Sequence, residues 1–217
     1  MSLSVALIDS GVNSGHPHIR DRQGSVRSWR VEGQTPSEFV AREVADVGDA
    51  VGHGTAAAAA ILDLAPGIQV ESIQIFEVGA TTEFERVLCA LDQALELEPD
   101  VCNLSLGTTR DLWNVQLEAR IERFVERGIP LVAPVLWRGL PCYPGSLVGC
   151  AGVRVDASLE RNRPELRSVG GRDDWFVSPF PRDLPGLPRE SNLAGASMAC
   201  ANLSGVFLRR LMDAQVR

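Results

Sequence analysis

The sequence contains no lysine, and its acidic residues outnumber its arginines to give a formal net charge of −7 at pH 7. Without lysine, the chain cannot form a serine–lysine dyad, a Schiff base or a lysine-dependent phosphate loop. Because no basic excess is available to neutralise phosphates, we expect no nucleic-acid partner. No apolar run is long enough to span a bilayer, so we expect no membrane association.

The cysteines are few and irregularly spaced, which disfavours a metal site or a disulfide framework. They number five, an odd count without a metal-ligand spacing. Cys142 and Cys150 could pair, but nothing in the sequence indicates an oxidising compartment. The N-terminal residues lead directly into an apolar segment, without a basic region or a signal-cleavage site. We therefore expect a cytoplasmic protein.

The chain does contain enough apolar material for a large core. Apolar residues make up 45% of the 217 residues, which argues against wholesale disorder. No internal repeat and no low-complexity tail is visible, and the length suits one large domain. We expect residues 1–217 to form a single domain.

Apolar segments typical of buried strands alternate with segments typical of helices. The expected strands lie within residues 4–11, 67–76, 100–107, 129–135, 146–155 and 175–180. The expected helices lie within residues 52–65, 82–98, 111–128 and 195–212. A proline-rich polar segment, residues 179–192, reads as a loop before the last helix. This alternation predicts an α/β fold, with a doubly wound, mostly parallel sheet and helices on both faces.

Three polar residues beside glycines stand where the expected strands and helices meet. Asp9 ends the first strand in "DSG", His53 begins the first helix in "GHGT", and Ser197 begins the last helix in "GAS". A serine becomes a useful nucleophile only beside a base, and a carboxylate must orient that base. His16 and His18 lie in a turn-like segment and are interpreted as surface residues, which leaves His53 as the base. For Ser197 alone, the alternative is a helix serine whose hydroxyl bonds to a backbone carbonyl.

The segments that hold these residues resemble a known family. "VALIDSGVNSGHPHI", "GHGTAAAAAI" and "GASMACANLSG" resemble the three signature segments of the subtilisin-like serine proteases (the subtilases, peptidase family S8), in that family's order of Asp, His and Ser. "DVCNLSLGT" looks like the family's substrate-binding strand, and "CYPG" like the turn beside its specificity pocket. An α/β-hydrolase would place the serine before its acid and histidine. The resemblance implies a subtilisin-like fold and a serine endopeptidase, a hydrolase with Asp9, His53 and Ser197 as its catalytic triad, an acyl-enzyme intermediate and no cofactor.

The resemblance also implies where a peptide or protein substrate binds. Family members hold the substrate as an extended strand between two segments of the protein. The matching residues here are Ser105, Leu106 and Gly107 on one side, and Gly79, Ala80 and Thr81 on the other. Cys142 matches a glycine at the floor of the specificity pocket and would shorten that pocket. Arg138 either contacts the substrate side chain that precedes the scissile bond or points to solvent. The shortened pocket and a contact with Arg138 would favour a small or acidic residue at this substrate position.

One position departs from the family in a way that bears on catalysis. Subtilisin-like proteases usually carry an asparagine that helps to stabilise the oxyanion, and the matched position here is Trp137. The backbone N–H of Ser197, near a helix start, would remain as one donor. Trp137 or Arg138 could supply a second donor, or the segment could be completed only when a substrate or partner chain binds. In the remaining alternative, the protein is a degenerate relative that binds peptides without cleaving them.

Two other departures concern calcium and the propeptide. The long calcium-binding loop after the histidine helix is missing, and His18 stands where many members have a calcium-binding aspartate, so no metal is expected. No propeptide precedes the first strand, although secreted relatives commonly need one to fold. We therefore expect a compact intracellular protease that folds unaided or with an activating partner chain. Trimming of one precursor peptide fits this protein better than general digestion.

Overall fold

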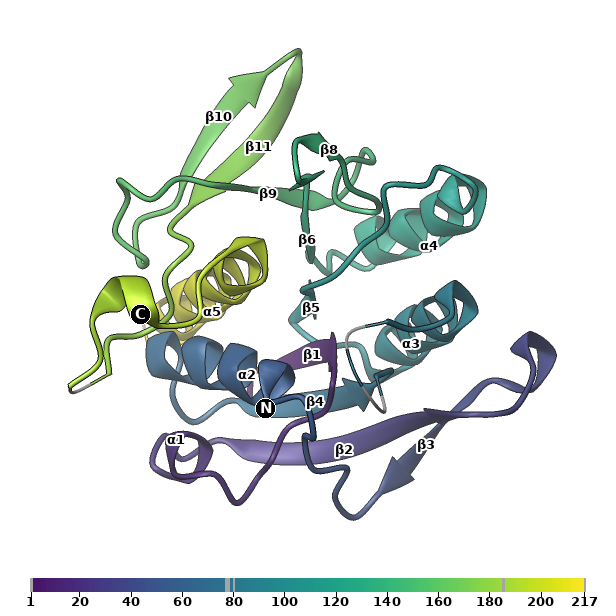
Figure 1. Ribbon diagram of the computed structural model, residues 1–217, viewed down its shortest axis with the longest axis horizontal. Coiled ribbons are helices and arrows are strands. Elements are labelled where there is room, and N and C mark those ends of the chain that lie inside the picture. Colours follow the sequence, from purple (N-terminus) through teal and green to yellow (C-terminus); the bar gives the residue numbers. More distant parts are fainter. Residues whose placement is uncertain (1, 77–78, 80, 185, 217) are drawn as a thin grey trace.

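A nine-stranded, mostly parallel sheet runs through the computed structural model, which describes residues 2–76, 79, 81–184 and 186–216 (Figure 1). Its strands lie in the order β10-β11-β9-β6-β5-β1-β4-β2-β3. They are β1 (Ser4–Asp9), β2 (Ser25–Glu32), β3 (Val40–Val44), β4 (Gln69–Gln74), β5 (Val101–Leu104), β6 (Leu131–Pro134), β9 (Ala151–Val155), β10 (Glu165–Val169) and β11 (Arg172–Val177). A separate two-stranded hairpin consists of β7 (Leu136–Trp137) and β8 (Leu140–Pro141).

Strand β1 lies at the point where the strand order changes direction. It pairs in parallel with β4 on one side and with β5 on the other. The antiparallel pairs of this sheet are β2 with β3 and β10 with β11, at its two edges. In sheets of this kind, ligands bind beyond the carboxyl ends of the strands, next to such a change of direction. The end of β1 at Asp9 is therefore at the place where a site is expected.

Helices cover both faces of the sheet, as the sequence predicts for a doubly wound fold. On one face lie α1 (Pro17–Arg20), α2 (His53–Leu64) and α5 (Ala196–Gln215), packed against one buried apolar cluster. On the other face lie α3 (Phe84–Leu97) and α4 (Asn114–Glu126), packed against a second cluster. Single turns of 3-10 helix occur at Pro36–Glu38 and Arg189–Ser191. In the described part of the chain, no helix has both the length and the apolar character that crossing a membrane requires.

Small residues allow α2 and α5 to pack very closely. The alanines at 57–60 of α2 are buried, and Gly205 of α5 faces the end of α2. A Cβ at position 205 would lie 2.9 Å from Leu64 Cβ and 3.2 Å from the Ile61 carbonyl oxygen. Because protein interiors are close-packed, this approach of the two helices depends on the absence of a side chain at position 205.

The sequence prediction missed three strands of the sheet, all in its edge regions. Strands β2, β3 and β10 were not predicted, because their residues are largely exposed or half-buried and carry many charged side chains. Such segments lack the apolar runs from which the other strands were predicted. The strand expected within residues 175–180 begins earlier, at Arg172, and ends at Val177, before Pro179.

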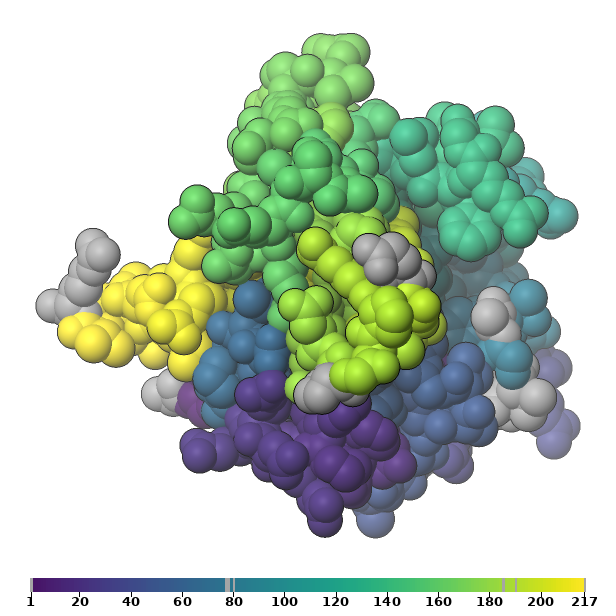
Figure 2. All heavy atoms as spheres, turned by 60° about the vertical axis from the view of Figure 1, so that its left-hand side comes forward, coloured from purple at the N-terminus to yellow at the C-terminus, as the bar shows by residue number. Residues whose placement is uncertain are grey.

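Residues 179–184 and 186–192 are mostly loop, as predicted, and lead towards α5. Figure 2 shows this segment in yellow-green on the surface, between the purple N-terminal part of the chain and the green part that precedes it in sequence. Asn192 Nδ2 donates a hydrogen bond of 3.0 Å to the Arg182 carbonyl oxygen within this segment. The loop thus carries the chain across the surface to Gly195, directly before α5.

Candidate active site

Asp9 and His53 form a hydrogen-bonded pair at the end of β1. The Asp9 carboxylate is 2% exposed and accepts a hydrogen bond of 2.7 Å from the Ser10 backbone N–H. His53 Nδ1 lies 2.8 Å from Asp9 Oδ1 and 2.9 Å from Asp9 Oδ2, and it donates to this carboxylate. With Nδ1 engaged, Nε2 of the same ring is left to accept a proton, which is the orientation a general base needs.

Two glycines bring His53 to Asp9. Gly52, with φ of 82°, has the left-handed backbone that lets the chain turn sharply into α2. Gly54 lies against β1, where an added Cβ would overlap the carbonyl oxygen of Gly11. Any side chain at position 54 would therefore push the start of α2 away from the end of β1. The sequence "GHG" is thus the local reason for the short Asp9–His53 distance.

The Asp9 carboxylate also changes the acidity of the imidazole. The hydrogen bond from His53 to Asp9 raises the pKa of His53 above its usual value, and the charges of Asp9 and Asp49 act in the same direction. Partial burial opposes this shift because it disfavours the charged imidazolium. The His53 side chain remains 34% exposed, so the ring is open to a ligand.

Ser197 is the second residue of α5, and its hydroxyl is hydrogen-bonded to a backbone carbonyl oxygen in this structure. Ser197 Oγ donates a hydrogen bond of 2.9 Å to the Ser105 carbonyl oxygen, and Ser105 Oγ donates one of 3.2 Å to the Ser197 carbonyl oxygen. Among the residues that the structure describes, no hydrogen bond joins Ser197 to His53. The acceptor is a carbonyl oxygen just after β5 and not one of the helix itself, so this bond differs from the local helix bond considered as the alternative for Ser197.

A single pocket nevertheless contains all three residues of the predicted triad. It has a volume of about 330 Å³. Its walls are formed by Asp9, Ser10, Val51, His53, Phe76, Gly79, Ser105, Leu106, Gly107, Pro134, Trp137, Cys142, Ala196 and Ser197. Apart from Asp9 and His53, these residues are apolar or uncharged. A ligand in the pocket therefore meets largely apolar walls and one polar edge.

Of the predicted substrate-binding residues that the structure describes, all but Thr81 line this pocket. Gly79 lines the pocket on one side, and Ser105, Leu106 and Gly107 line it on the other. Thr81 is exposed and does not line the pocket. Ala80 lies outside the described residues. The sequence prediction missed Val51 and Phe76, which line the pocket in addition. Their nearness to His53 and to the end of β4 was the only sequence signal that could have indicated them.

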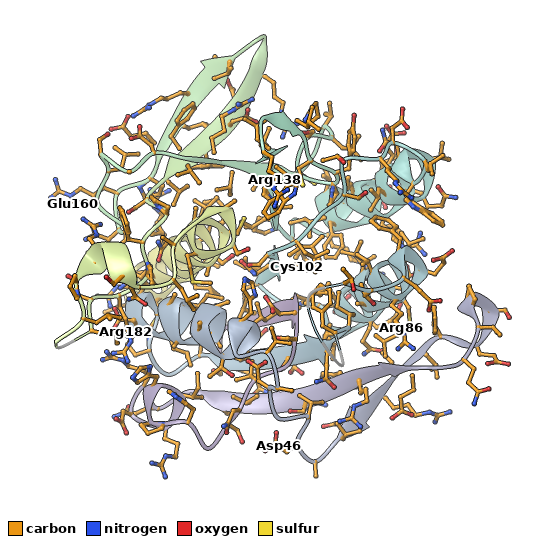
Figure 3. The ribbon with its side chains drawn as sticks, in the orientation of Figure 1. Asp46, Arg86, Cys102, Arg138, Glu160 and Arg182 are labelled. Carbon is orange, nitrogen blue, oxygen red and sulfur yellow. The ribbon has the colours of Figure 1, made fainter. Side chains whose placement is uncertain are left out.

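The segment that departs from the family pattern forms the β7–β8 hairpin. Trp137 lines the pocket but is 56% exposed, and its indole N–H has no hydrogen-bond partner among the described residues. Arg138 has a left-handed backbone with φ of 51°, and its guanidinium lies 5.6 Å from the centre of the Trp137 ring. Figure 3 labels Arg138 near this hairpin. Arg138 does not line the pocket. This favours the prediction that Arg138 points to solvent over the prediction that it contacts a substrate side chain.

Cys142 lines the pocket beside Gly107. The cysteine is 2% exposed, and a Cβ on Gly107 would lie 2.6 Å from Cys142 Sγ. Burial raises the pKa of Cys142 to about 11, so the thiol is neutral at physiological pH. Cys142 and Cys150 are unpaired, as are the other cysteines. Among the described residues, no group of three or more His, Cys, Asp or Glu side chains is arranged to hold a metal ion.

Comparison with known proteins shows that the chain is similar to subtilases. A family model described as the subtilase family matches residues 2–133. Subtilisin NAT of Bacillus subtilis subsp. natto is 25% identical over 216 residues, which cover 93% of this chain and 51% of that protein. The chain therefore spans about half the length of the first curated relatives that it matches.

Solved structures show the same fold. A cold adapted subtilisin-like serine proteinase has a TM-score of 0.68 and 17% identity, covering 97% of this chain and 76% of that one. The prenylagaramide maturation protease PagA has a TM-score of 0.66 and 18% identity, covering 99% of this chain and 78% of that one. At these identities the likeness establishes the fold alone.

The raised pKa of His53 predicts how the site responds to pH. His53 can take a proton from Ser197 only while the imidazole is neutral, so Ser197 should lose reactivity as the pH falls through a pKa above 6.5. In Asp9→Asn, the carboxylate is lost, so this midpoint should move to lower pH. Loss of the correct His53 tautomer should also reduce the rate at which Ser197 reacts, on the order of 10⁴-fold.

The titration can be followed directly by NMR of the imidazole signals. The chain has three histidines, so His53→Gln identifies the signal of His53. An unchanged midpoint in Asp9→Asn would show that the Asp9 carboxylate does not control the protonation of His53.

Proposed function

This chain belongs to the subtilase family, and from that premise we propose that it is a serine endopeptidase that cleaves peptide bonds through an acyl-enzyme at Ser197. The observation that carries the proposal is the pocket in which the hydrogen-bonded Asp9–His53 pair and Ser197 meet.

The first half of the reaction forms the acyl-enzyme. The Ser197 hydroxyl turns from the Ser105 carbonyl oxygen towards His53, whose Nε2 takes its proton as Oγ bonds to the substrate carbonyl carbon. The Asp9 carboxylate stabilises the resulting imidazolium and stays ionised. His53 then gives the proton to the leaving nitrogen, and the peptide C–N bond breaks to release an amine.

The second half returns the enzyme to its starting state. A water molecule gives a proton to His53 Nε2 as its oxygen attacks the acyl carbon. The proton passes to Ser197 Oγ as the ester bond breaks, which releases the new carboxyl group. The net reaction is the addition of one water molecule across one peptide bond, without any cofactor.

The backbone near Ser105 is free to hold a substrate strand. Thr108 and Tyr143 exchange two backbone hydrogen bonds, of 3.0 and 2.8 Å, beyond the end of β5. In the described part of the chain, the backbone groups of Leu106 and Gly107 make no hydrogen bond with other backbone groups. Free backbone groups at a strand end are what an extended peptide needs in order to pair with the protein. These residues support the binding of substrate as an added strand.

The pocket favours a small, uncharged residue before the scissile bond. Cys142 lies beside Gly107, and among the described residues no arginine lines the pocket. Arg138 stacks near Trp137 instead. We therefore favour small residues over acidic ones at this substrate position.

We place the protein in the cytoplasm, with one precursor peptide or protein as its substrate and a possible activating partner chain. The free state of the cysteines supports a reducing location. The fold is one that the prenylagaramide maturation protease also uses, so a processing role is compatible with this architecture.

A second candidate function is peptide binding without cleavage. Two observations favour it: the Ser197 hydroxyl bonds to a carbonyl oxygen rather than to His53, and a tryptophan occupies the usual asparagine position. In this alternative, the pocket and the free backbone near Leu106 would still hold an extended peptide. The two functions differ in whether Ser197 reacts.

Labelling with a fluorophosphonate separates these functions. The endopeptidase should gain one phosphonyl group at Ser197, detected by mass spectrometry, because the neighbouring base activates the serine. Ser197→Ala should not be labelled, and Ser168→Ala, at an exposed serine of β10, should react like the parent. No labelling together with peptide binding would favour the binding module, and labelling only after a partner is added would show dependence on that partner.

Replacement of Trp137 by phenylalanine tests the second oxyanion donor. Trp137→Phe keeps the ring and removes only the indole N–H, so kcat should fall while KM changes little. Loss of the asparagine donor of a subtilisin lowers kcat on the order of 10²–10³-fold, which sets the scale. The matched control is Trp113→Phe, because Trp113 stacks on Phe84 and does not line the pocket.

Arg138→Ala completes the oxyanion test. If Trp137→Phe cleaves as fast as the parent, Arg138→Ala should show the loss instead. Two silent variants would mean that side chains of the β7–β8 hairpin do not stabilise the oxyanion.

Cys142→Gly tests the depth of the pocket. Removal of the side chain should raise kcat/KM for substrates with a larger apolar residue before the scissile bond by about tenfold or more, relative to small residues. A peptide library sorted by the residue before the cut measures this preference. Cys89→Ala, at a half-buried cysteine of α3 outside the pocket, is the control. An unchanged preference would show that Cys142 does not limit the pocket.

A further inference from the structure

Asp49 lies on the loop before α2, outside the predicted triad, and its carboxylate accepts several hydrogen bonds. On the helix side, Oδ1 accepts from the backbone N–H groups of Val51 at 3.2 Å and Gly52 at 2.7 Å. Oδ2 accepts from Thr55, at 2.8 Å from its backbone nitrogen and 2.6 Å from its hydroxyl. Gly52, the residue that caps α2, has no side chain, so Asp49 satisfies donors at this helix start in its place.

The same carboxylate is also tied to the end of β1. Ser10 Oγ donates a hydrogen bond of 2.8 Å to Asp49 Oδ1 and accepts one of 3.0 Å from the Gly54 backbone N–H. The Ser10 backbone N–H in turn donates to Asp9 Oδ1 at 2.7 Å. One carboxylate therefore links the residue next to Asp9 with the residues on both sides of His53.

A further bond extends this connection to the segment after β1. The Thr55 hydroxyl, which donates to Asp49, accepts a hydrogen bond of 3.0 Å from the Asn13 backbone N–H. Asp49 and Thr55 are half-buried or buried, so these bonds are partly shielded from water. Charge-assisted bonds of this kind are stronger than neutral ones.

We propose that Asp49 is a positioning residue that fixes the distance and orientation between the Asp9 carboxylate and the His53 imidazole. It acts through Ser10 on one side and through the first turn of α2 on the other. The kinetic part of this inference rests on the proposed endopeptidase function, whereas the geometric part does not.

The charge of Asp49 adds an electrostatic effect that a simple helix cap would lack. The Asp9 hydrogen bond is the main cause of the raised pKa of His53, and the charge of Asp49 contributes in the same direction. Among the described residues of the pocket lining, Cys142 is the titratable group besides Asp9 and His53, and its buried thiol is neutral. Among the described groups, Asp9 and Asp49 are therefore the two carboxylates whose loss should lower the pKa of His53.

The test compares Asp49→Ala and Asp49→Asn with the control Asp46→Asn. Asp46 is an exposed residue of the same loop, placed at the edge of the molecule in Figure 3, and it bonds to Gly48 and Ser14 rather than to the triad. The control thus removes the same charge from the same loop. For each variant, the measurements are the His53 titration by NMR, the melting temperature, and kcat and KM.

Both Asp49 variants should titrate His53 at lower pH than the parent, and Asp46→Asn should leave the titration unchanged. Asp49→Ala should lower kcat by about tenfold to a hundredfold with little change in KM, because small misplacements of catalytic groups have effects of this size. Asp49→Asn keeps one acceptor oxygen, so its loss in kcat should be smaller.

A lower melting temperature with an unchanged His53 titration and unchanged kcat would overturn the proposal and leave Asp49 as a helix cap. If Asp49→Ala does not fold, Asp49→Asn decides the question by its titration. If the parent protein shows no reactivity at Ser197, the proposed function fails. The NMR titration still tests the positioning role, and an unchanged pKa of His53 would refute it.

Discussion

The contact between the end of β1 and the start of α2 is the constraint on which the site depends. Gly54 lies so close to the Gly11 carbonyl that no side chain fits between them, and this approach places His53 within hydrogen-bond distance of Asp9. The contact consists of backbone and of short polar side chains, which have few alternative conformations. A site of this kind is held rigidly before substrate binds, as a catalytic pair requires.

The serine reaches the same pocket through a different set of interactions. Close packing of α5 on α2 fixes the last helix, and buried polar side chains link this helix to β5. Asn103 donates a hydrogen bond of 2.7 Å to Ser105 Oγ and accepts one of 3.0 Å from Ser204 Oγ. Loss of one partner would leave a buried polar group unsatisfied, at a cost of about 1–3 kcal/mol. Two further hydrogen bonds join Ser105 to Ser197, and in one of them the Ser105 carbonyl oxygen accepts from the Ser197 hydroxyl.

The fold class and the meeting of Asp9, His53 and Ser197 at one pocket could be predicted from the sequence, but the edge of the sheet and the contacts that support Asp9 and His53 could not. Buried strands such as β1 and β5 are short apolar runs, and residues beside glycines mark the junctions that hold Asp9, His53 and Ser197. Strands β2, β3 and β10 have exposed, charged side chains that resemble loops in sequence. Asp49 could not be distinguished from the other acidic residues of loops in the sequence. Its role depends on hydrogen-bond donors such as Ser10 and Thr55, which form no recognisable motif with it.

The sequence by itself determined which residue types stand at each strand–helix junction, because glycine spacing and apolar periodicity are local properties of the chain. Only the tertiary structure decided the direction of the Ser197 hydroxyl, the position of Trp137 at the pocket and the place of Cys142 beside Gly107 in the lining of that pocket. It also brought Asp49 to Ser10. These contacts join residues far apart in the chain, so they depend on how the strands and helices pack and not on any local pattern.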